Sequence, residues 1–200
     1  MSGDEAAAPI DVCVMTDAEL WALSTSTNPD AFGLIFDRHV SAVHRYCARR
    51  TGSLDAADDL VSIVFLEAWR RRAAVVLESD TALPWLLGIA RMTLRRRART
   101  AVRHRRAIER LPHALFSPNH ADDVIDILDG RARAADVMVA FRRLGPIDQD
   151  VIALCLWQGL DYASAAVALG VPIGTVRSRL SRARGRLVTL LAPTSPFQEN

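Results

Sequence analysis

The segment 161–187, DYASAAVALGVPIGTVRSRLSRARGRL, contains two helical patterns separated by one glycine. Asp161 is placed to cap the first helix, and Gly170 suits the left-handed position that ends it. Val171-Pro172 follows, and a second helix is expected over residues 172–191. A helix, a tight turn and a second helix form a helix-turn-helix, a motif that places its second helix in the major groove of DNA. The sequence therefore predicts DNA as the leading partner.

The expected second helix sorts its side chains onto two faces. At about 100° per residue, the aliphatic residues that we expect to pack inward fall on one side: Ile173, Val176, Leu180, Ala183 and Leu187. The opposite side is small, polar and cationic. Its arginines can donate two hydrogen bonds to guanine, and its serines can reach bases or phosphates. The alternative is a surface helix whose cationic face is only solvated.

Composition favours an all-α fold. Half of the residues are hydrophobic, 6% are aromatic, and the long alternating runs typical of strands are absent. All 25 lysine-plus-arginine positions are arginine. Residues 91–110 hold nine arginines and one acid, Glu109, whereas residues 121–129 hold four aspartates and no basic residue. This pattern predicts two small helical domains joined by an acidic linker, the C-terminal one carrying the helix-turn-helix.

Turn-forming residues and charge divide the chain further. We expect a disordered N-terminal extension over 1–15, a first helical domain over 16–111, the acidic linker over 112–130, the helix-turn-helix domain over 131–192 and a tail over 193–200. The N-terminus lacks a signal pattern, and no apolar run reaches the roughly 18 residues of a membrane span. The sequence therefore predicts a cytoplasmic chain without membrane insertion.

No catalytic or metal-binding pattern stands out. The three cysteines are far apart, and the five histidines have no metal-ligand spacing. Neither a glycine-rich phosphate loop nor a nucleophile motif is present. We expect no disulfide, no metal and no cofactor, and an enzyme is the least favoured class.

A second basic surface is expected on the helix after Pro84, which reads PWLLGIARMTLRRRARTAVRHRR. Arg91, Arg95 and Arg99 are spaced four residues apart and share one face. Such a face attracts a polyanion whatever its sequence, and a merely solvated face is the alternative. Trp85 fits the core better than a stacking contact with an unpaired base, and both interpretations stay open.

The helix expected over 55–72 has more apolar surface than one core stripe uses. Its large apolar residues lie on more than one side: Leu60, Ile63, Val64, Phe65, Leu66 and Trp69. Acidic residues stand at its start. Excess apolar surface of this kind is typical of a helix that docks on another protein. Burial of the whole set in the core is an equal alternative.

Two long segments resemble a known family. The C-terminal one is GLDYASAAVALGVPIGTVRSRLSRARGRL, preceded by LGPIDQDVIALCLWQGL. The N-terminal one is FDRHVSAVHRYCARRTGSLDAADDLVSIVFLEAWRR, followed by LPWLLGIARMTLRRRAR. Over residues 30–192 the chain resembles a two-domain sigma factor of the extracytoplasmic-function group.

The resemblance implies a role for each surface. Seven residues would contact core RNA polymerase: Asp58, Asp59, Leu60, Ile63, Phe65, Leu66 and Trp69. The loop at 74–83 and the next helix would read and melt the −10 element through Trp85, Arg91, Met92, Arg95, Arg96 and Arg99. The last helix would read the −35 element as duplex through Gly174, Thr175, Arg177, Ser178, Arg179, Ser181, Arg182 and Arg184.

The resemblance also implies the partners. The first domain would bind the β′ clamp of core RNA polymerase, the second domain would bind the β flap, and both would contact promoter DNA. The acidic linker would thread the polymerase's basic channels, and catalysis would belong to the polymerase. Sigma factors of this group are often held by an anti-sigma factor, which the resemblance admits as a further partner.

Two departures from the family pattern bear on the polymerase and −10 contacts. Ser62-Ile63 stands where many relatives have Gln-Glu or Gln-Asp, which predicts altered polymerase contacts. Met92 stands where many relatives have asparagine, and a thioether cannot make an amide's hydrogen bonds. The −10 preference is therefore expected to differ or to be relaxed.

One alternative belongs to a different class of DNA-binding protein. An autonomous helix-turn-helix regulator would act without polymerase binding and would need a dimer to read two half-sites. The sequence contains no clear heptad seam or sensor domain for that role.

Overall fold

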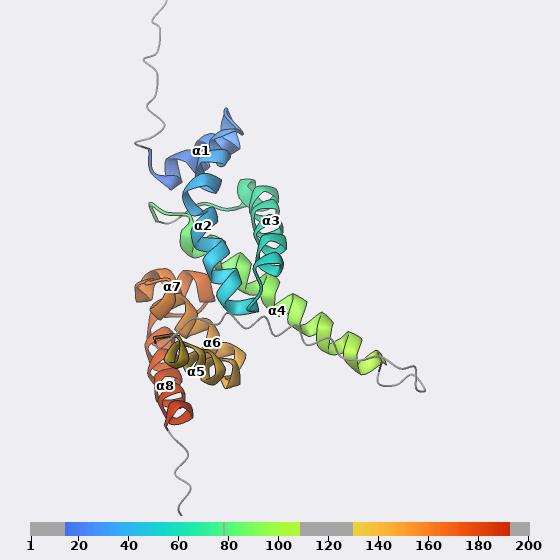
Figure 1. Ribbon diagram of the computed structural model, residues 1–200. Helices are drawn as coiled ribbons and strands as arrows, with labels where there is room; N and C mark the ends of the chain where they lie inside the picture. The colour runs from blue at the N-terminus through green and yellow to red at the C-terminus, as the bar shows by residue number, and fades with distance from the viewer. Residues whose placement is uncertain (1–14, 78, 109–129, 193–200) are drawn as a thin grey trace, which may run out of the picture.

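The computed structural model describes residues 15–77, 79–108 and 130–192, and all regular elements in these ranges are helices (Figure 1). They are, in order, α1 (Asp17–Ser26), α2 (Ala31–Thr51), α3 (Leu54–Arg71), the 3-10 helix η1 (Arg72–Ala74), α4 (Leu83–Ile108), α5 (Gly130–Arg143), α6 (Pro146–Ile152), the π-helical turn η2 (Ala153–Trp157), α7 (Tyr162–Leu169) and α8 (Ile173–Leu191). The all-α prediction is confirmed. The expected N-terminal extension, acidic linker and tail lie almost wholly outside the described residues.

α2 and α3 form an antiparallel hairpin around a tight turn. α2 ends at Gly52, whose φ of 73° is a left-handed conformation that glycine adopts without strain. The Ser53 side chain accepts a hydrogen bond from the Ala56 amide and caps α3. α4 packs against both helices, and its C-terminal half projects away from the rest of the molecule (Figure 1).

The indole of Trp21 joins α1 to the segment after α3. Its Nε1 donates hydrogen bonds to the carbonyl oxygens of Arg72 and Val75, at 3.1 and 3.0 Å. Its ring packs edge-on against Trp85 of α4, with ring centroids 5.0 Å apart. A buried indole N–H needs a hydrogen-bond partner, and here the partners are two carbonyls of the segment that follows α3. These hydrogen bonds therefore hold that segment against α1 on its way to α4.

Asp17 is a buried carboxylate at the start of α1. It accepts hydrogen bonds from the Arg38 guanidinium of α2 and from the Ala82 amide just before α4, and the His39 ring lies within hydrogen-bond distance. Burial alone raises the pKa of Asp17, but the hydrogen bonds with His39, Ala82 and Arg38 outweigh it and hold the pKa well below its usual value. One side chain thus joins three elements.

The second helical unit consists of α5 to α8. α6 begins after Gly145 with Pro146 in its first turn, where a helix has no use for the missing proline N–H. The helix continues as the π-helical turn η2, and Trp157 at its end packs on Phe141 of α5 with ring centroids 4.2 Å apart. This contact packs η2 against α5. α7 in turn packs against η2, and α8 packs against α5.

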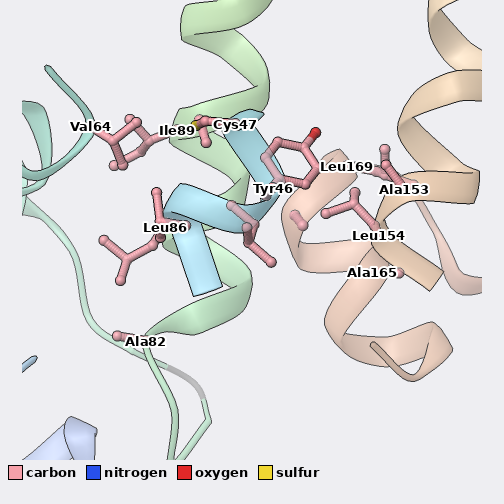
Figure 2. Close-up of a cluster of buried hydrophobic side chains, with 14 of the residues drawn as sticks. Tyr46, Cys47, Val64, Ala82, Leu86, Ile89, Ala153, Leu154, Ala165 and Leu169 are labelled. Atoms are coloured by element: carbon pink, nitrogen blue, oxygen red, sulfur yellow. The ribbon is translucent and has the colours of Figure 1, made fainter. Parts of the chain in front are cut away.

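The first unit, which consists of α1 to α4, and the second unit share one hydrophobic core. The buried apolar residues form a single contiguous cluster that runs from α1 to α8. Where the units meet, the Tyr46 ring of α2 lies beside Leu154 of η2 and Leu169 of α7 (Figure 2). Tyr46 retains only 1% of its surface exposed, and Leu154 retains none. Side-chain packing therefore positions the units relative to each other, in addition to the chain that connects them.

Candidate nucleic-acid interface

α7 and α8 form the helix-turn-helix. The Asp161 carboxylate accepts a hydrogen bond from the Ser164 amide at 2.7 Å and caps α7, and this bond lowers the pKa of Asp161. Gly170 ends α7 with a φ of 65°, and its amide bonds back to the Ala166 carbonyl. The predicted Asp161 cap and left-handed Gly170 are confirmed.

The inner face of α8 packs against the other helices of its unit. Val176, Leu180 and Ala183 are buried, and Leu187 is half-buried, as expected. Ile173 was also expected to pack inward, but 44% of its surface is exposed. Ile173 is the first residue of α8 and stands at the edge of the unit, where no neighbouring helix covers it.

The outer face of α8 carries the residues expected to read DNA. Six of them are exposed: Gly174, Arg177, Ser178, Ser181, Arg182 and Arg184. Two are partly exposed: Thr175 and Arg179. One arginine of α8, Arg186, has an acidic partner among the described residues: it pairs with Asp148 of α6. The other arginines of α8 have no acidic partner among the described residues, and three of them are exposed: Arg177, Arg182 and Arg184.

Two contacts orient arginines on this face without neutralising them. The Arg177 guanidinium lies over the Tyr162 ring, 5.5 Å from its centroid. Arg182 Nε donates a hydrogen bond to the Ser178 carbonyl at 3.2 Å. Since neither partner is an acid, neither contact compensates the positive charge of these guanidinium groups, which stays available to a polyanion.

α4 presents part of its expected DNA-contacting set to solvent. Arg96 and Arg99 are exposed, and Met92 leaves 42% of its surface exposed. Trp85 is half-buried and packs on Trp21, so much of its ring already has an aromatic neighbour. The structure thus favours a packing role for Trp85 over a free stacking surface.

Arg91 and Arg95 turn toward the second unit. Asp150 of α6 is fully buried, and Arg95, Arg50 and Arg91 approach its carboxylate oxygens to 2.6, 3.1 and 3.7 Å. Burial raises the pKa of the Asp150 carboxyl, and the positive charges of the three arginines oppose that rise.

Arg91 also binds the end of α7. Its Nε donates to the Ala168 carbonyl and its Nη2 to the Leu169 carbonyl, both at 3.2 Å. These carbonyls belong to the last turn of α7, where the helix dipole is negative. Burial lowers the pKa of Arg91, and the negative charge of Asp150 counteracts that effect.

Gly88 allows α4 to approach the backbone of α7 closely. A Cβ atom added at Gly88 would lie 3.2 Å from the Ala168 carbonyl oxygen, which is closer than ordinary van der Waals contact. Sequence reasoning singled out neither Gly88 nor Asp150. Asp150 could have been predicted to need a buried cationic partner, because it is an acid in the helical run PIDQDVIALCLW, which is otherwise largely apolar. Gly88 carried none, because its partner is far away in the sequence.

α3 exposes an acidic and apolar surface, which we call the α3 surface: Asp58, Asp59, Ile63 and Leu66. Ile63 and Leu66 each leave 48% of their surface exposed. They are three residues apart and therefore lie side by side on the helix. The excess apolar surface predicted for this helix is thus divided between the core and solvent.

Two residues predicted to contact polymerase are buried in the core of the free chain. Leu60 is fully buried and Phe65 is 5% exposed, because α3 packs against both α2 and α4. Phe65 packs edge-on against Phe32, with ring centroids 6.5 Å apart. Trp69 is half-buried and packs against the same ring at 5.4 Å.

Among the described residues, no cluster of histidine, cysteine and carboxylate side chains could hold a metal ion. No helix in the described parts of the chain is both long and apolar enough to cross a membrane. Burial raises the pKa of the Cys47 thiol to about 12, which keeps it protonated and unreactive.

Family models match both units. Residues 35–108 match the model of Sigma-70 region 2, and residues 134–187 match that of Sigma-70, region 4. The RNA polymerase sigma factor HrpL of Pseudomonas syringae pv. syringae is 33% identical over 77% of this chain and 83% of that protein. The ECF RNA polymerase sigma factor SigM of Mycobacterium tuberculosis is 33% identical over 88% of this chain and 85% of that protein.

A third relative is longer than this chain. The ECF RNA polymerase sigma factor BldN of Streptomyces coelicolor is 30% identical over 86% of this chain, which spans 65% of that protein.

Solved structures show the same helical arrangement. CnrH, solved with the cytosolic domain of CnrY, superposes with a TM-score of 0.61 at 26% identity and covers 90% of this chain and 99% of that chain. The sigma factor RpoE, solved with the anti-sigma factor NepR from Bartonella quintana, has a TM-score of 0.62 at 24% identity. It covers 83% of this chain and 99% of that chain, and it supports the fold alone.

Proposed function

Because the chain belongs to the extracytoplasmic-function sigma factors of RNA polymerase, we propose that it binds core polymerase and directs transcription initiation through two DNA-contacting surfaces. α8 reads the −35 element as duplex, and α4 with the loop before it reads the −10 element. The chain acts in the cytoplasm, and the polymerase supplies all the catalysis. The comparisons give no support to a regulator that acts without polymerase.

The observation that carries this proposal is the uncompensated cationic face of α8. Arg177 and Arg182 are exposed, and a guanidinium group matches the O6 and N7 acceptors of guanine with two hydrogen bonds. A Cβ atom added at Gly174 would meet nothing within 4 Å, so the start of α8 is open to a close approach of DNA. The flanking arginines supply phosphate contacts, which position the helix.

α4 serves the −10 element in a different way. Arg96 and Arg99 are exposed and provide sequence-independent attraction to phosphates. Met92 lies on the same helix, and its exposed thioether offers apolar contact to a base in place of amide hydrogen bonds. This combination favours recognition by shape and apolar contact over a strict hydrogen-bond code at that position.

The α3 surface is the proposed contact with the β′ clamp of core polymerase, and the second unit contacts the β flap. Exposed Ile63 and Leu66 provide apolar area, and Asp58 and Asp59 provide negative charge beside it. Binding that buries apolar side chains inside a polar rim is typical of a specific protein interface.

A protein partner is proposed on the basis of the family and of one solved neighbour. Sigma factors of this group are often held by an anti-sigma factor, and CnrH, at 26% identity, was solved with the cytosolic domain of CnrY. We infer that this chain also accepts an anti-sigma factor. Affinity purification of the tagged chain from its native cells tests this, because an inhibitor and the polymerase subunits would each be recovered with it.

Transcription with purified components tests the main proposal. Core polymerase is combined with the full chain and a library of promoter fragments from the native genome, and run-off products are counted. We expect the chain to stimulate transcription from a discrete set of promoters that share −10 and −35 elements. Absence of stimulation on every fragment would contradict the proposal.

A pair of arginine substitutions separates base reading from general attraction. Arg177→Ala is expected to weaken holoenzyme binding to a cognate promoter by about 1–3 kcal/mol and to relax base preference at the −35 element. Arg97→Ala, on the exposed side of α4, is expected to weaken binding to all sequences alike and to reduce the salt dependence. Filter binding to cognate and scrambled −35 elements at several salt concentrations measures both effects. Equal losses on both DNA sequences for both variants would refute base reading by α8.

A further inference from the structure

Arg177 is the arginine of α8 that lies against an aromatic ring in the described part of the chain. Its guanidinium carbon is 5.5 Å from the ring centroid of Tyr162, the first residue of α7. We propose that Tyr162 is a positioning residue for −35 recognition, because its ring holds the Arg177 guanidinium where a base can accept hydrogen bonds from it. The inference rests on the proposed function, which assigns Arg177 to the −35 element, and Tyr162 lies outside the set of residues predicted to contact DNA.

The core of the second unit fixes the backbone on both sides of this contact. Ala165 lies one turn after Tyr162 on α7, Val176 directly precedes Arg177 on α8, and both alanine and valine are fully buried. Between the two helices, Gly170 is left-handed, and its amide donates a hydrogen bond back into the last turn of α7. Packing and a fixed turn therefore set the distance between the two backbones, and adjustment is left to the two side chains.

The ring restrains Arg177 without occupying its hydrogen-bond donors. A guanidinium group over an aromatic face is attracted by the ring electrons, while its N–H groups point outward in the plane of the group. Arg186 shows the contrast, because its Nη1 donates to the Asp148 carboxylate, which also compensates its charge. Arg177 therefore keeps both its charge and the pair of donors that matches the O6 and N7 acceptors of guanine.

Restraint of Arg177 in the free chain favours its contact with a base. A long side chain loses rotamer freedom when an interface immobilises it, and that loss weakens binding. Arg177 is exposed, and Tyr162 leaves 39% of its own surface exposed, so the pair stands at the surface that DNA would approach. Because the ring already limits the rotamers of Arg177, less freedom is lost on binding. The gain concerns the base contact of Arg177, so it should appear as base preference.

The Tyr162 hydroxyl offers a competing explanation. It belongs to the first residue of α7, where the positive end of the helix dipole favours a phosphate. A hydroxyl that donates to a phosphate would position the helix-turn-helix on DNA of any sequence. The two roles depend on different parts of the side chain, because positioning of Arg177 uses the ring and a phosphate contact uses the hydroxyl.

Two substitutions separate these roles in the free full chain. Tyr162→Phe keeps the ring and removes the hydroxyl, whereas Tyr162→Leu removes the ring and keeps an apolar side chain of good helix propensity. Circular dichroism establishes that both variants remain helical. The Arg177 Nε–H signal is identified in NMR spectra as the one that Arg177→Ala lacks. We expect Tyr162→Phe to keep its wild-type proton shift and Tyr162→Leu to change it, because the ring current is lost. An unchanged shift in Tyr162→Leu would overturn the inference without any use of DNA.

Holoenzyme binding to a promoter found by run-off transcription gives the second readout. Tyr162→Leu is expected to bind the cognate −35 element about three- to tenfold more weakly than wild type, and to bind a scrambled element as wild type does. Tyr162→Phe is the matched control and should bind both elements as wild type does. If Tyr162→Phe lost as much affinity as Tyr162→Leu, a hydroxyl contact with DNA would replace the positioning role.

A double-mutant cycle decides whether Tyr162 acts through Arg177. Once Arg177→Ala has removed the guanidinium, Tyr162→Leu should change cognate binding no further, so the two losses should not add. Additive losses would contradict the inference, because Tyr162 would then act independently of Arg177. A loss in Arg177→Ala without a loss in Tyr162→Leu counts against the inference alone. Cognate binding that Arg177→Ala leaves unchanged counts against base reading by this arginine, and so against the proposed function as well.

Discussion

Replacement of Asp17 by alanine is expected to lower the free energy of unfolding by about 3 kcal/mol, the typical loss when one partner of a buried ion pair is removed. The Asp17 side chain is 5% exposed. It accepts hydrogen bonds from Arg38 and from the Ala82 amide, and it lies within hydrogen-bond distance of the His39 ring. Its removal leaves a buried amide without a hydrogen-bond partner and takes away the counter-charge of Arg38. Urea denaturation followed by circular dichroism measures the loss as a lower transition midpoint.

Asp37→Ala is the control for this experiment. Asp37 is exposed on α2, next to the residues that contact Asp17, and its removal should change the free energy of unfolding by less than about 0.5 kcal/mol. Equal losses in the two variants would mean that the effect comes from helix propensity or net charge and that the buried contacts contribute nothing.

The contribution of Asp17 depends on pH with a definite sign. Its pKa is depressed in the folded state, so the stabilisation is fully present above the unfolded-state pKa of about 3.9 and is lost as pH falls toward the folded-state pKa. The difference in stability between wild type and Asp17→Asn should therefore be constant at neutral pH and shrink in acid. A difference that grows as the pH falls from 5 to 3 would reverse the assignment.

Loss of polymerase engagement is the second large effect that we expect. The double substitution Ile63→Asp and Leu66→Asp should reduce promoter-specific transcription by more than about a hundredfold. Complete burial of an apolar side chain of this size contributes about 1.5–3 kcal/mol, of which a half-exposed side chain has about half still to gain. Burial of a new carboxylate is unfavourable in addition. Both side chains are about half exposed in the free chain, so the fold should survive the change. Core polymerase binding, measured by co-elution, should fall in parallel with transcription.

Leu54→Asp is the matched control for charge. Leu54 is 59% exposed and is the first residue of α3, where an acidic side chain favours the helix dipole. It adds a carboxylate to the same helix far from Leu66, and transcription should stay near the wild-type level. If Leu54→Asp abolished transcription as the double variant does, the α3 surface would lose its assigned role.

Leu60→Ala should lower the free energy of unfolding by about 2–5 kcal/mol, because Leu60 is a core residue, whereas the surface substitutions should leave that free energy nearly unchanged.

Local patterns in the sequence predicted the helix-turn-helix down to single residues. The Asp161 cap, the left-handed Gly170 and the buried stripe through Val176 and Leu180 all depend on neighbours within a few positions. Helix periodicity alone then places the arginines of α8 on the opposite side. Ile173 departed from this pattern because periodicity does not reveal where a neighbouring helix stops covering the face.

Other residues needed the three-dimensional packing. On α3, sequence reasoning detected more apolar surface than one core stripe needs, but only the positions of α2 and α4 decide that Leu60 and Phe65 face inward while Ile63 and Leu66 face solvent. The same holds for Trp85, because its packing partner Trp21 comes from a helix remote in sequence.

By itself, the sequence determined the all-helical class, the two basic surfaces and the face of α8 that carries the uncompensated arginines, because periodicity, capping and charge are local properties of a chain. Only the tertiary structure decided that Arg91 and Arg95 lie against Asp150 and that Gly88 lies against Ala168. The residues of each pair lie more than fifty positions apart in the sequence. Burial and Coulomb attraction depend on how close two groups are in space, and the order of residues along the chain does not reveal that distance.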